Sequence, residues 1–187
     1  MNPSTTTPLH GTRQTLTRGL VLLFALCCGA IVANIYYAQP IVELIAPDVG
    51  LSAHSASLIV SLTQVGYALG LLFLVPLADL LENRKLMIGT AIVATASLFI
   101  AGLSEHANGF LMISLLIGFS SVSVQMLIPL AAHLAPEETR GQVVGNIMGG
   151  LLLGILLARP LSSLIADHFG WRAVFMSASV MMMTMFL

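Results

Sequence analysis

Arg159 is the residue whose position in this sequence most strongly implies a chemical role. It lies in the stretch GGLLLGILLARP, which carries no other charge. A guanidinium placed in hydrocarbon costs about 3 kcal/mol or more unless it reaches the headgroups, pairs with another group or lines a watery cavity. Two interpretations stay open. Either the long side chain snorkels to the outer headgroups, or it lines a cavity, where it attracts an anionic group of a solute or pairs with a carboxylate.

Neutral polar side chains recur within the other apolar stretches. Asn34 and Tyr37 are three residues apart and share a helix face, Gln64 and Tyr67 lie side by side on the next helix, and Gln125 follows in a fourth. In lipid, such residues either hydrogen-bond neighbouring helices or contribute to a cavity. The candidate cavity residues are therefore Asn34, Tyr37, Gln64, Tyr67, Gln125 and Arg159.

Four glycines close to Arg159 have the spacing of a helix contact. Gly145 with Gly149, and Gly150 with Gly154, form two small-x-x-x-small pairs. This spacing lets two helix backbones approach closely. We expect all four glycines to pack against a neighbouring helix.

No combination of residues indicates an enzyme, a metal site or a cofactor. Cys27 and Cys28 are adjacent, which disfavours a disulfide, and we interpret them as small packing residues. The histidines lack metal-binding spacing, and we find neither a nucleotide-binding loop nor a nucleophile with a base. The net charge of -1 excludes a general attraction to nucleic acid.

The elements that must position these residues are membrane-spanning helices. Hydrophobic residues make up 57% of the 187 residues and charged residues only 8%, which leaves too little polar surface for a water-soluble domain. About 20 apolar residues are needed to cross the bilayer. We predict an all-α bundle with a lipid bilayer as its surroundings and with spans at about 18–42, 54–78, 86–104, 109–134, 142–166 and 172–187. The last of these is expected to be truncated, since 16 residues reach only about 24 Å.

The distribution of basic residues predicts the orientation. Arg18, Arg84, Lys85 and Arg140 lie on one side of this scheme, together with Arg13, and Arg172 lies on the other. Cytoplasmic loops carry the excess of Lys and Arg. We therefore expect a multi-pass protein with a cytoplasmic tail over 1–17.

A weak internal repeat relates the two halves of the chain. A shift of 88 residues aligns Gly66 with Gly154, and it also aligns Asp79 with Asp167 and Arg84 with Arg172. The aligned segments lie on opposite sides of the predicted membrane, which is the arrangement of an inverted repeat of three plus three helices. The alternative is coincidence, because Asp and Arg recur wherever loops meet lipid.

Four strings together resemble the major facilitator superfamily. The loop VPLADLLENRKL is similar to that family's signature between helices two and three, with Asp79, Arg84 and Lys85 in register. NIYYAQP, PEETRGQVVG and GWRAVF are similar to bacterial drug and sugar efflux members. The resemblance implies a six-helix half of a secondary transporter in the bacterial inner membrane. It also implies a cytoplasmic gate formed by Asp79, Arg84, Lys85 and Arg140.

Several positions depart from the pattern of the family. Val75 and Glu82 replace glycines of the loop, and Leu80 replaces a basic residue. Ser114 stands where an arginine is usual in helix four. Helix five matches the antiporter glycine-proline pattern only in part, because Ile155, Ala158 and Arg159 replace its later members.

Two functions remain open at this stage. The first is efflux of a small solute or drug by alternating access, with the site between this half and a possible second half. The second is a membrane helix bundle that does not transport, from a decayed or truncated gene. The solute, the direction of transport and the coupling ion are not determined by the sequence.

Overall fold

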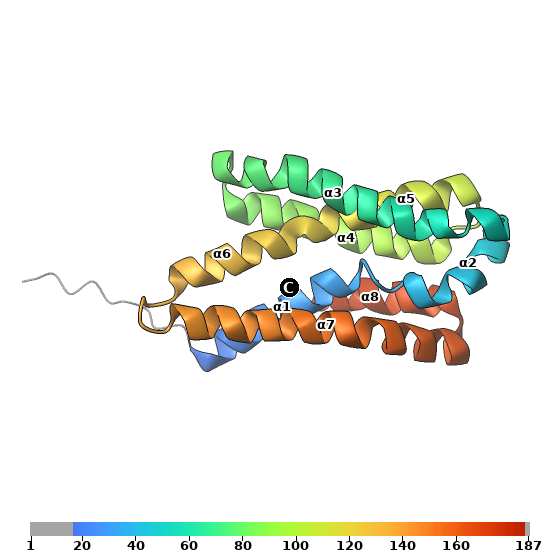
Figure 1. The fold of residues 1–187 in the computed structure, drawn as a ribbon. Coiled ribbons are helices and arrows are strands. Elements are labelled where there is room, and N and C mark those ends of the chain that lie inside the picture. Colours follow the sequence, from blue (N-terminus) through green and yellow to red (C-terminus); the bar gives the residue numbers. More distant parts are fainter. Residues whose placement is uncertain (1–16, 186–187) are drawn as a thin grey trace, which may run out of the picture.

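The computed structural model describes residues 17–185, apart from the side chain of Asp79. The expected tail over 1–17 therefore lies outside the described residues except for Thr17, and so does the end of the expected sixth span. The elements run lengthwise beside one another (Figure 1), in the order α1 (Arg18–Ala33), η1 (Gln39–Ile41), α2 (Val42–Asp48), η2 (Ala53–Ser55), α3 (Ser57–Leu80), α4 (Asn83–Leu103), α5 (Ala107–Ser120), η3 (Ser121–Ser123), α6 (Val124–Leu134), α7 (Arg140–Phe169) and α8 (Trp171–Met185). The described residues contain no strand.

The outward sides of these helices are apolar. Leu72 and Leu156 are 65% and 68% exposed, and many other large hydrophobic side chains are exposed with them. Four helical stretches are long and apolar enough to cross a membrane, namely Ala53–Ala78, Asn83–Leu103, Ala107–Leu134 and Arg140–Phe169. Continuous helices satisfy their own backbone hydrogen bonds, as lipid requires. The predicted all-α membrane bundle is confirmed.

The first expected span, 18–42, is not one continuous helix. Helix α1 ends at Ala33, and residues 34–38 form successive turns before η1 and α2. Pro40 has no N–H to donate to the carbonyl of Tyr36, so the regular helical hydrogen bonds cannot run through this segment. The first expected span is therefore an interrupted helix and not a continuous one.

The fourth expected span, 109–134, is interrupted in a similar way. Helix α5 ends at Ser120, and η3 separates it from α6. The hydroxyls of Ser120 and Ser121 both donate to the carbonyl of Ile117, at 3.2 and 2.6 Å. Such bonds compete with the helix ladder. The repeat shift of 88 residues carries Ala33 onto Ser121, so the two breaks occupy equivalent positions.

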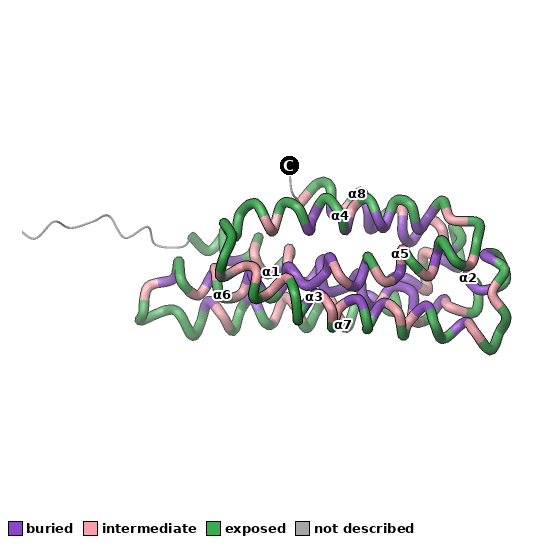
Figure 2. The backbone as a smooth tube through the Cα atoms, turned by 90° about the horizontal axis from the view of Figure 1, so that it is seen from above, coloured by how far each residue is buried: buried purple, intermediate pink, exposed green. Residues whose placement is uncertain are grey.

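The helices pair in a pattern that an inverted repeat would produce. The most extensive contacts join α3 with α5, α1 with α7, and α4 with α8. The first set consists of α1 with α2, then α3 and α4, and the second set consists of α5 with α6, then α7 and α8. Exchanging the two sets converts the α3–α5 pair into the α7–α1 pair and leaves the α4–α8 pair unchanged. Figure 2 shows α4 and α8 together on one side of the bundle, with buried residues on the surfaces between the helices.

Glycines permit the close approach of α1 and α7. A Cβ added at Gly154 would lie 2.5 Å from the Cα of Gly29, and one added at Gly150 would lie 2.6 Å from the carbonyl oxygen of Ala25. Backbone this close leaves no room for a side chain. The packing expected for Gly150 and Gly154 is thus present.

The expectation for the other glycine pair is not met within the described residues. A Cβ added at Gly145 or at Gly149 would meet nothing within 4 Å. Gly145 lies on an exposed side of α7. The pattern of small residues alone could not distinguish which side of α7 faces α1.

Asp48, Trp171, Arg172 and Ser104 form a hydrogen-bonded cluster, called the clasp below. It lies at the end of the bundle opposite Arg18. Asp48 accepts hydrogen bonds from the Trp171 indole N–H and the Arg172 guanidinium, both at 2.9 Å. Arg172 also donates to the carbonyl of Ser104 at 3.4 Å. Gly170 has φ of +83°, which lets the chain turn sharply between α7 and α8. The clasp thereby ties α2, the end of α4 and the start of α8 together.

We predict opposite effects for the same substitution at two positions of α7. Gly154→Ala should lower stability by about 1–3 kcal/mol, because the added methyl group overlaps the backbone of Gly29. Gly145→Ala meets no neighbouring atom and should be neutral or stabilising by up to about 1 kcal/mol. The measurement is thermal unfolding of each variant in detergent. Equal effects at the two positions would contradict this packing.

The clasp predicts a pH dependence that Asp48 controls. Hydrogen bonds from Trp171, and then from Arg172, lower the pKa of Asp48 below its usual value. A lowered pKa in the folded state stabilises the fold above the pKa of the unfolded state, about 3.9, and this stabilisation is lost as the pH falls through the lower value. Asp48→Asn should therefore lower the melting temperature at pH 6, and the difference from the parent should shrink below about pH 4. A difference that stays constant across this range would exclude the clasp.

Candidate functional site

The candidate site is a cavity of about 200 Å³ between α1, α3, α6 and α7. Its polar lining comes from Tyr36, Gln64, Tyr67 and Gln125, and its apolar lining consists of Val32, Ile35, Val124, Leu151 and Ile155. Tyr36 belongs to the turns that follow α1, and Gln125 belongs to the first turn of α6. The cavity therefore lies where the two interrupted helices meet.

One hydrogen bond crosses this cavity between distant parts of the chain. The Gln125 side-chain amide donates to the Tyr67 hydroxyl at 2.9 Å. Gln64 and Tyr67 reach the cavity together because they are three residues apart on α3. Of the six predicted cavity residues, the structure thus brings Gln64, Tyr67 and Gln125 into one lining.

Asn34 and Tyr37 do not line this cavity, contrary to the expectation. Asn34 is 2% exposed, and neither polar atom of its side chain has a partner in the described part of the chain. Tyr37 is 8% exposed, and its carbonyl accepts a hydrogen bond from the Ser162 hydroxyl at 2.6 Å. The residues of this segment that line the cavity are Val32, Ile35 and Tyr36, whose spacing is that of one helix face, and Asn34 and Tyr37 lie on a different face.

Tyr36 is a cavity residue that sequence reasoning missed. It lines the cavity, and its ring centroid also lies 5.7 Å from the guanidinium carbon of Arg159. The signal that could have identified it is its helical spacing from Val32 and Ile35, which places the three residues on one face.

Arg159 faces the interrupted segment of the first span. Its Nη2 donates to the side-chain oxygen of Gln39 at 2.6 Å, and the guanidinium lies over Tyr36. A cation over an aromatic ring is attracted by its electron-rich face. Arg159 is exposed and does not itself line the cavity, although Tyr36 joins it to that lining, so both interpretations of Arg159 stay open. Gln39, at the start of η1, is a second contributor that was absent from the predicted cavity set.

The described side chains of the predicted gate residues, those of Arg84, Lys85 and Arg140, make no hydrogen bond or ion pair with one another. Arg84 and Lys85 lie in the first turn of α4, where Lys85 pairs with Glu82 at 2.8 Å. Arg140 donates to the carbonyl of Ala132 at 3.0 Å. The side chain of Asp79, at the end of α3, lies outside the described residues. Exposed pairs such as Lys85 with Glu82 contribute at most about 0.5 kcal/mol.

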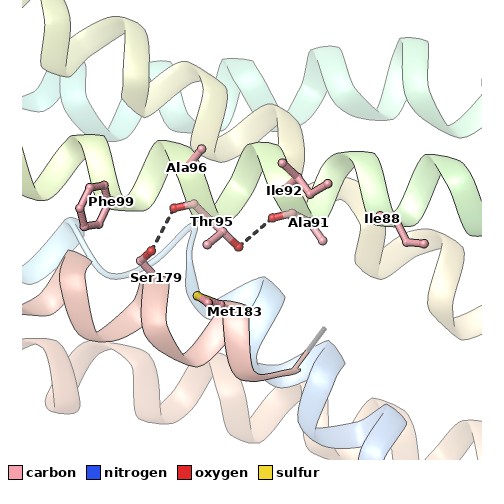
Figure 3. A pocket seen from close by; sticks show the side chains of 8 residues that line it. All are labelled: Ile88, Ala91, Ile92, Thr95, Ala96, Phe99, Ser179 and Met183. Atoms are coloured by element: carbon pink, nitrogen blue, oxygen red, sulfur yellow. Dashed lines mark hydrogen bonds between the residues drawn. The ribbon is translucent and has the colours of Figure 1, made fainter. Parts of the chain in front are cut away.

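A larger hollow between α4 and α8 lacks comparable chemistry. It measures about 570 Å³, and its lining is mostly apolar (Figure 3). Its two hydroxyls are already used, since Ser179 donates to the carbonyl of Thr95 at 3.1 Å and Thr95 donates to that of Ala91 at 2.8 Å. We interpret this hollow as a groove on the apolar outer surface.

Comparisons with known proteins place these features in a family context. The sequence model of the Major Facilitator Superfamily matches residues 10–187. Uncharacterized transporter YgaY of Escherichia coli O157:H7 is 47% identical over 172 residues, which cover 92% of this chain and 44% of that protein. Probable transporter SCO4007 of Streptomyces coelicolor is 36% identical over 193 residues, 96% of this chain and 45% of that protein.

A more distant relative carries a name that states a function. Multidrug resistance protein MdtG of Salmonella paratyphi A is 26% identical over 149 residues, which cover 76% of this chain and 37% of that protein. This chain therefore matches less than half the length of each of these relatives.

The hydrogen bond from Ser162 predicts that removing this hydroxyl lowers the stability of the fold. Ser162 is fully buried, and its donation to Tyr37 satisfies a carbonyl beside the helix break. Ser162→Ala should lower the free energy of unfolding by about 0.5–1.5 kcal/mol. Ser163→Ala is the matched control on the same turn of α7, and it should have little effect. Chemical denaturation in detergent measures both, and an equal loss in the two variants would exclude this role of Ser162.

Proposed function

This chain belongs to the major facilitator superfamily, and we propose that it forms the amino-terminal half of a secondary transporter for a small solute. Transporter sites typically lie at the repeat interface near the middle of the bilayer and are built from discontinuous helices. The observation that carries the proposal is the polar cavity at the two helix breaks, lined by Tyr36, Gln64, Tyr67 and Gln125. Rocking of this half against a second half would expose that cavity to each side in turn.

A second half has a suitable surface to contact. Helix α7 is the least buried of the four long apolar stretches. Its outer side carries Leu152 and Leu156, both exposed, together with Gly145, where an added Cβ would meet no neighbour within 4 Å. We propose that a helix of the second half packs on this side, with Gly145 and Gly149 allowing close approach.

Orientation and direction complete the proposal. Arg18, Arg84, Lys85 and Arg140 lie at one end of the bundle, and Arg172 lies at the other (Figure 1). The excess of basic residues supports a cytoplasmic position for the first end, in the inner membrane of a bacterium. The same loop residues, with Asp79, would contact the second half as a cytoplasmic gate. MdtG is named a multidrug resistance protein, and on that ground we propose efflux as the direction.

Access to the cavity from both sides of the membrane tests the proposed function. The experiment uses a chimera in which this chain replaces the matching segment of YgaY. All other cysteines are removed, and Ile155→Cys introduces one thiol into the cavity lining. We expect a membrane-impermeant maleimide to label this thiol both from outside intact cells and from the cytoplasmic side in inverted vesicles. Labelling of His106→Cys from outside only and of Thr139→Cys from inside only verifies the orientation.

The control and the contrary outcome use the same chimera. Phe99→Cys lies in the apolar groove between α4 and α8, so it should be labelled from neither side. Labelling of Ile155→Cys from one side only would contradict alternating access. That result would favour the other interpretation, a membrane bundle that does not transport.

A further inference from the structure

We propose that the end of the cavity next to Arg159 binds the anionic group of a small organic solute, with the Arg159 guanidinium as its ligand. This inference rests on the proposed function, because it names the chemical class of the solute that the proposed transporter would accept. It also makes Gln39 and Tyr36 the residues that position the guanidinium.

The charge of Arg159 has no counter-ion among the side chains that the structure describes. The two ion pairs between those side chains join Lys85 to Glu82 and Arg172 to Asp48. Arg159 lies ten residues before the end of α7, which places it about 15 Å along the helix from that end. A cation at this depth is costly unless something compensates it. A bound anion would supply that compensation.

Neutral groups hold the guanidinium in position. The side-chain oxygen of Gln39 accepts from Nη2, and the ring of Tyr36 lies beneath the group. These are the contacts that the described residues give to a side chain with five N–H donors. Gln39 and Tyr36 orient the guanidinium without cancelling its charge. The planar fork of an arginine suits a carboxylate or a similar oxyanion, which it can bind through two parallel bonds.

The cavity lining favours an anion over a cation. The lining contains no Asp or Glu, and its polar groups are the hydroxyls of Tyr36 and Tyr67 and the amides of Gln64 and Gln125. These groups can bond the neutral body of a solute. Tyr36 connects the two parts, because it lines the cavity and contacts the guanidinium. The charge of Arg159 would repel a cation there.

Reagents of opposite charge test this inference on the chain alone in detergent or nanodiscs. With Cys27 and Cys28 replaced by alanine, Ile155→Cys places a thiol one helical turn from Arg159. The rates of modification by an anionic sulfonate and by a cationic trimethylammonium methanethiosulfonate reagent are measured. We expect the anionic-to-cationic rate ratio to fall at least tenfold in Arg159→Gln and to be largely kept in Arg159→Lys. A ratio that changes less than twofold in Arg159→Gln would overturn the inference.

Two further measurements separate binding from mere charge. Benzoate should protect the Ile155→Cys thiol from a neutral methanethiosulfonate reagent, its uncharged analogue benzamide should not, and Arg159→Gln should abolish the protection. Equal protection by both compounds would overturn the inference. Leu151→Cys, one turn further away, should show a smaller effect of Arg159→Gln on the rate ratio.

The outcomes are distinguishable from those for the proposed function. A thiol labelled from both sides of the membrane with an unchanged charge ratio leaves the transporter standing and removes the anion site. A changed charge ratio with labelling from one side only keeps the anion site and contradicts the proposed transporter.

Discussion

Hydrocarbon leaves no water to satisfy an open backbone group, and this constraint governs where the present fold can be irregular. Most of the bundle obeys it with continuous helices. The two interruptions at membrane depth are both supported by protein groups: Ser162 donates to the carbonyl of Tyr37 beside the first break, and Ser120 and Ser121 donate to helix carbonyls at the second. Irregular backbone is tolerated in a membrane where it is buried in protein or lines a cavity. Here it does both, because the polar cavity opens between the two breaks.

The pairing of helices explains how both breaks come to the same place. Helix α1 packs on α7 through Gly29, Gly150 and Gly154, and α3 packs on α5 where Gly66 meets Leu115 and Gly118 meets Thr63. Under an inverted repeat these two contacts are equivalent, so each brings one interrupted helix against one continuous helix. The same geometry sets Arg159 of α7 opposite the unwound segment that follows α1. Its contacts are with Tyr36 of these turns and with Gln39 at the start of η1.

The fold could be predicted from sequence where one physical rule dominates. Long apolar stretches and sparse charge were sufficient for the all-α membrane bundle, and four strings, the loop around Arg84 among them, were together sufficient for the family. The break after Ala33 was missed because hydrophobicity does not register a change of backbone geometry. Asn34 and Tyr37 were chosen over Tyr36 because polarity does not say which face of a helix meets the cavity. Gly145 and Gly149 show a related limit, since a small-residue pattern marks a close contact without saying which helix provides it.

The central claim is that, at membrane depth, water reaches the side of α7 that lines the cavity. In the chain alone, lipid covers the neighbouring side, on which the second half is proposed to pack. Spin labels attached in turn at Leu151, Leu152, Ile155 and Leu156 of the chain in bilayers test this by electron paramagnetic resonance power saturation. Leu151 and Ile155, which line the cavity, should collide preferentially with a water-soluble nickel complex, and the exposed Leu152 and Leu156 should collide preferentially with oxygen from the lipid. Uniform preference for oxygen at all four positions would contradict the account.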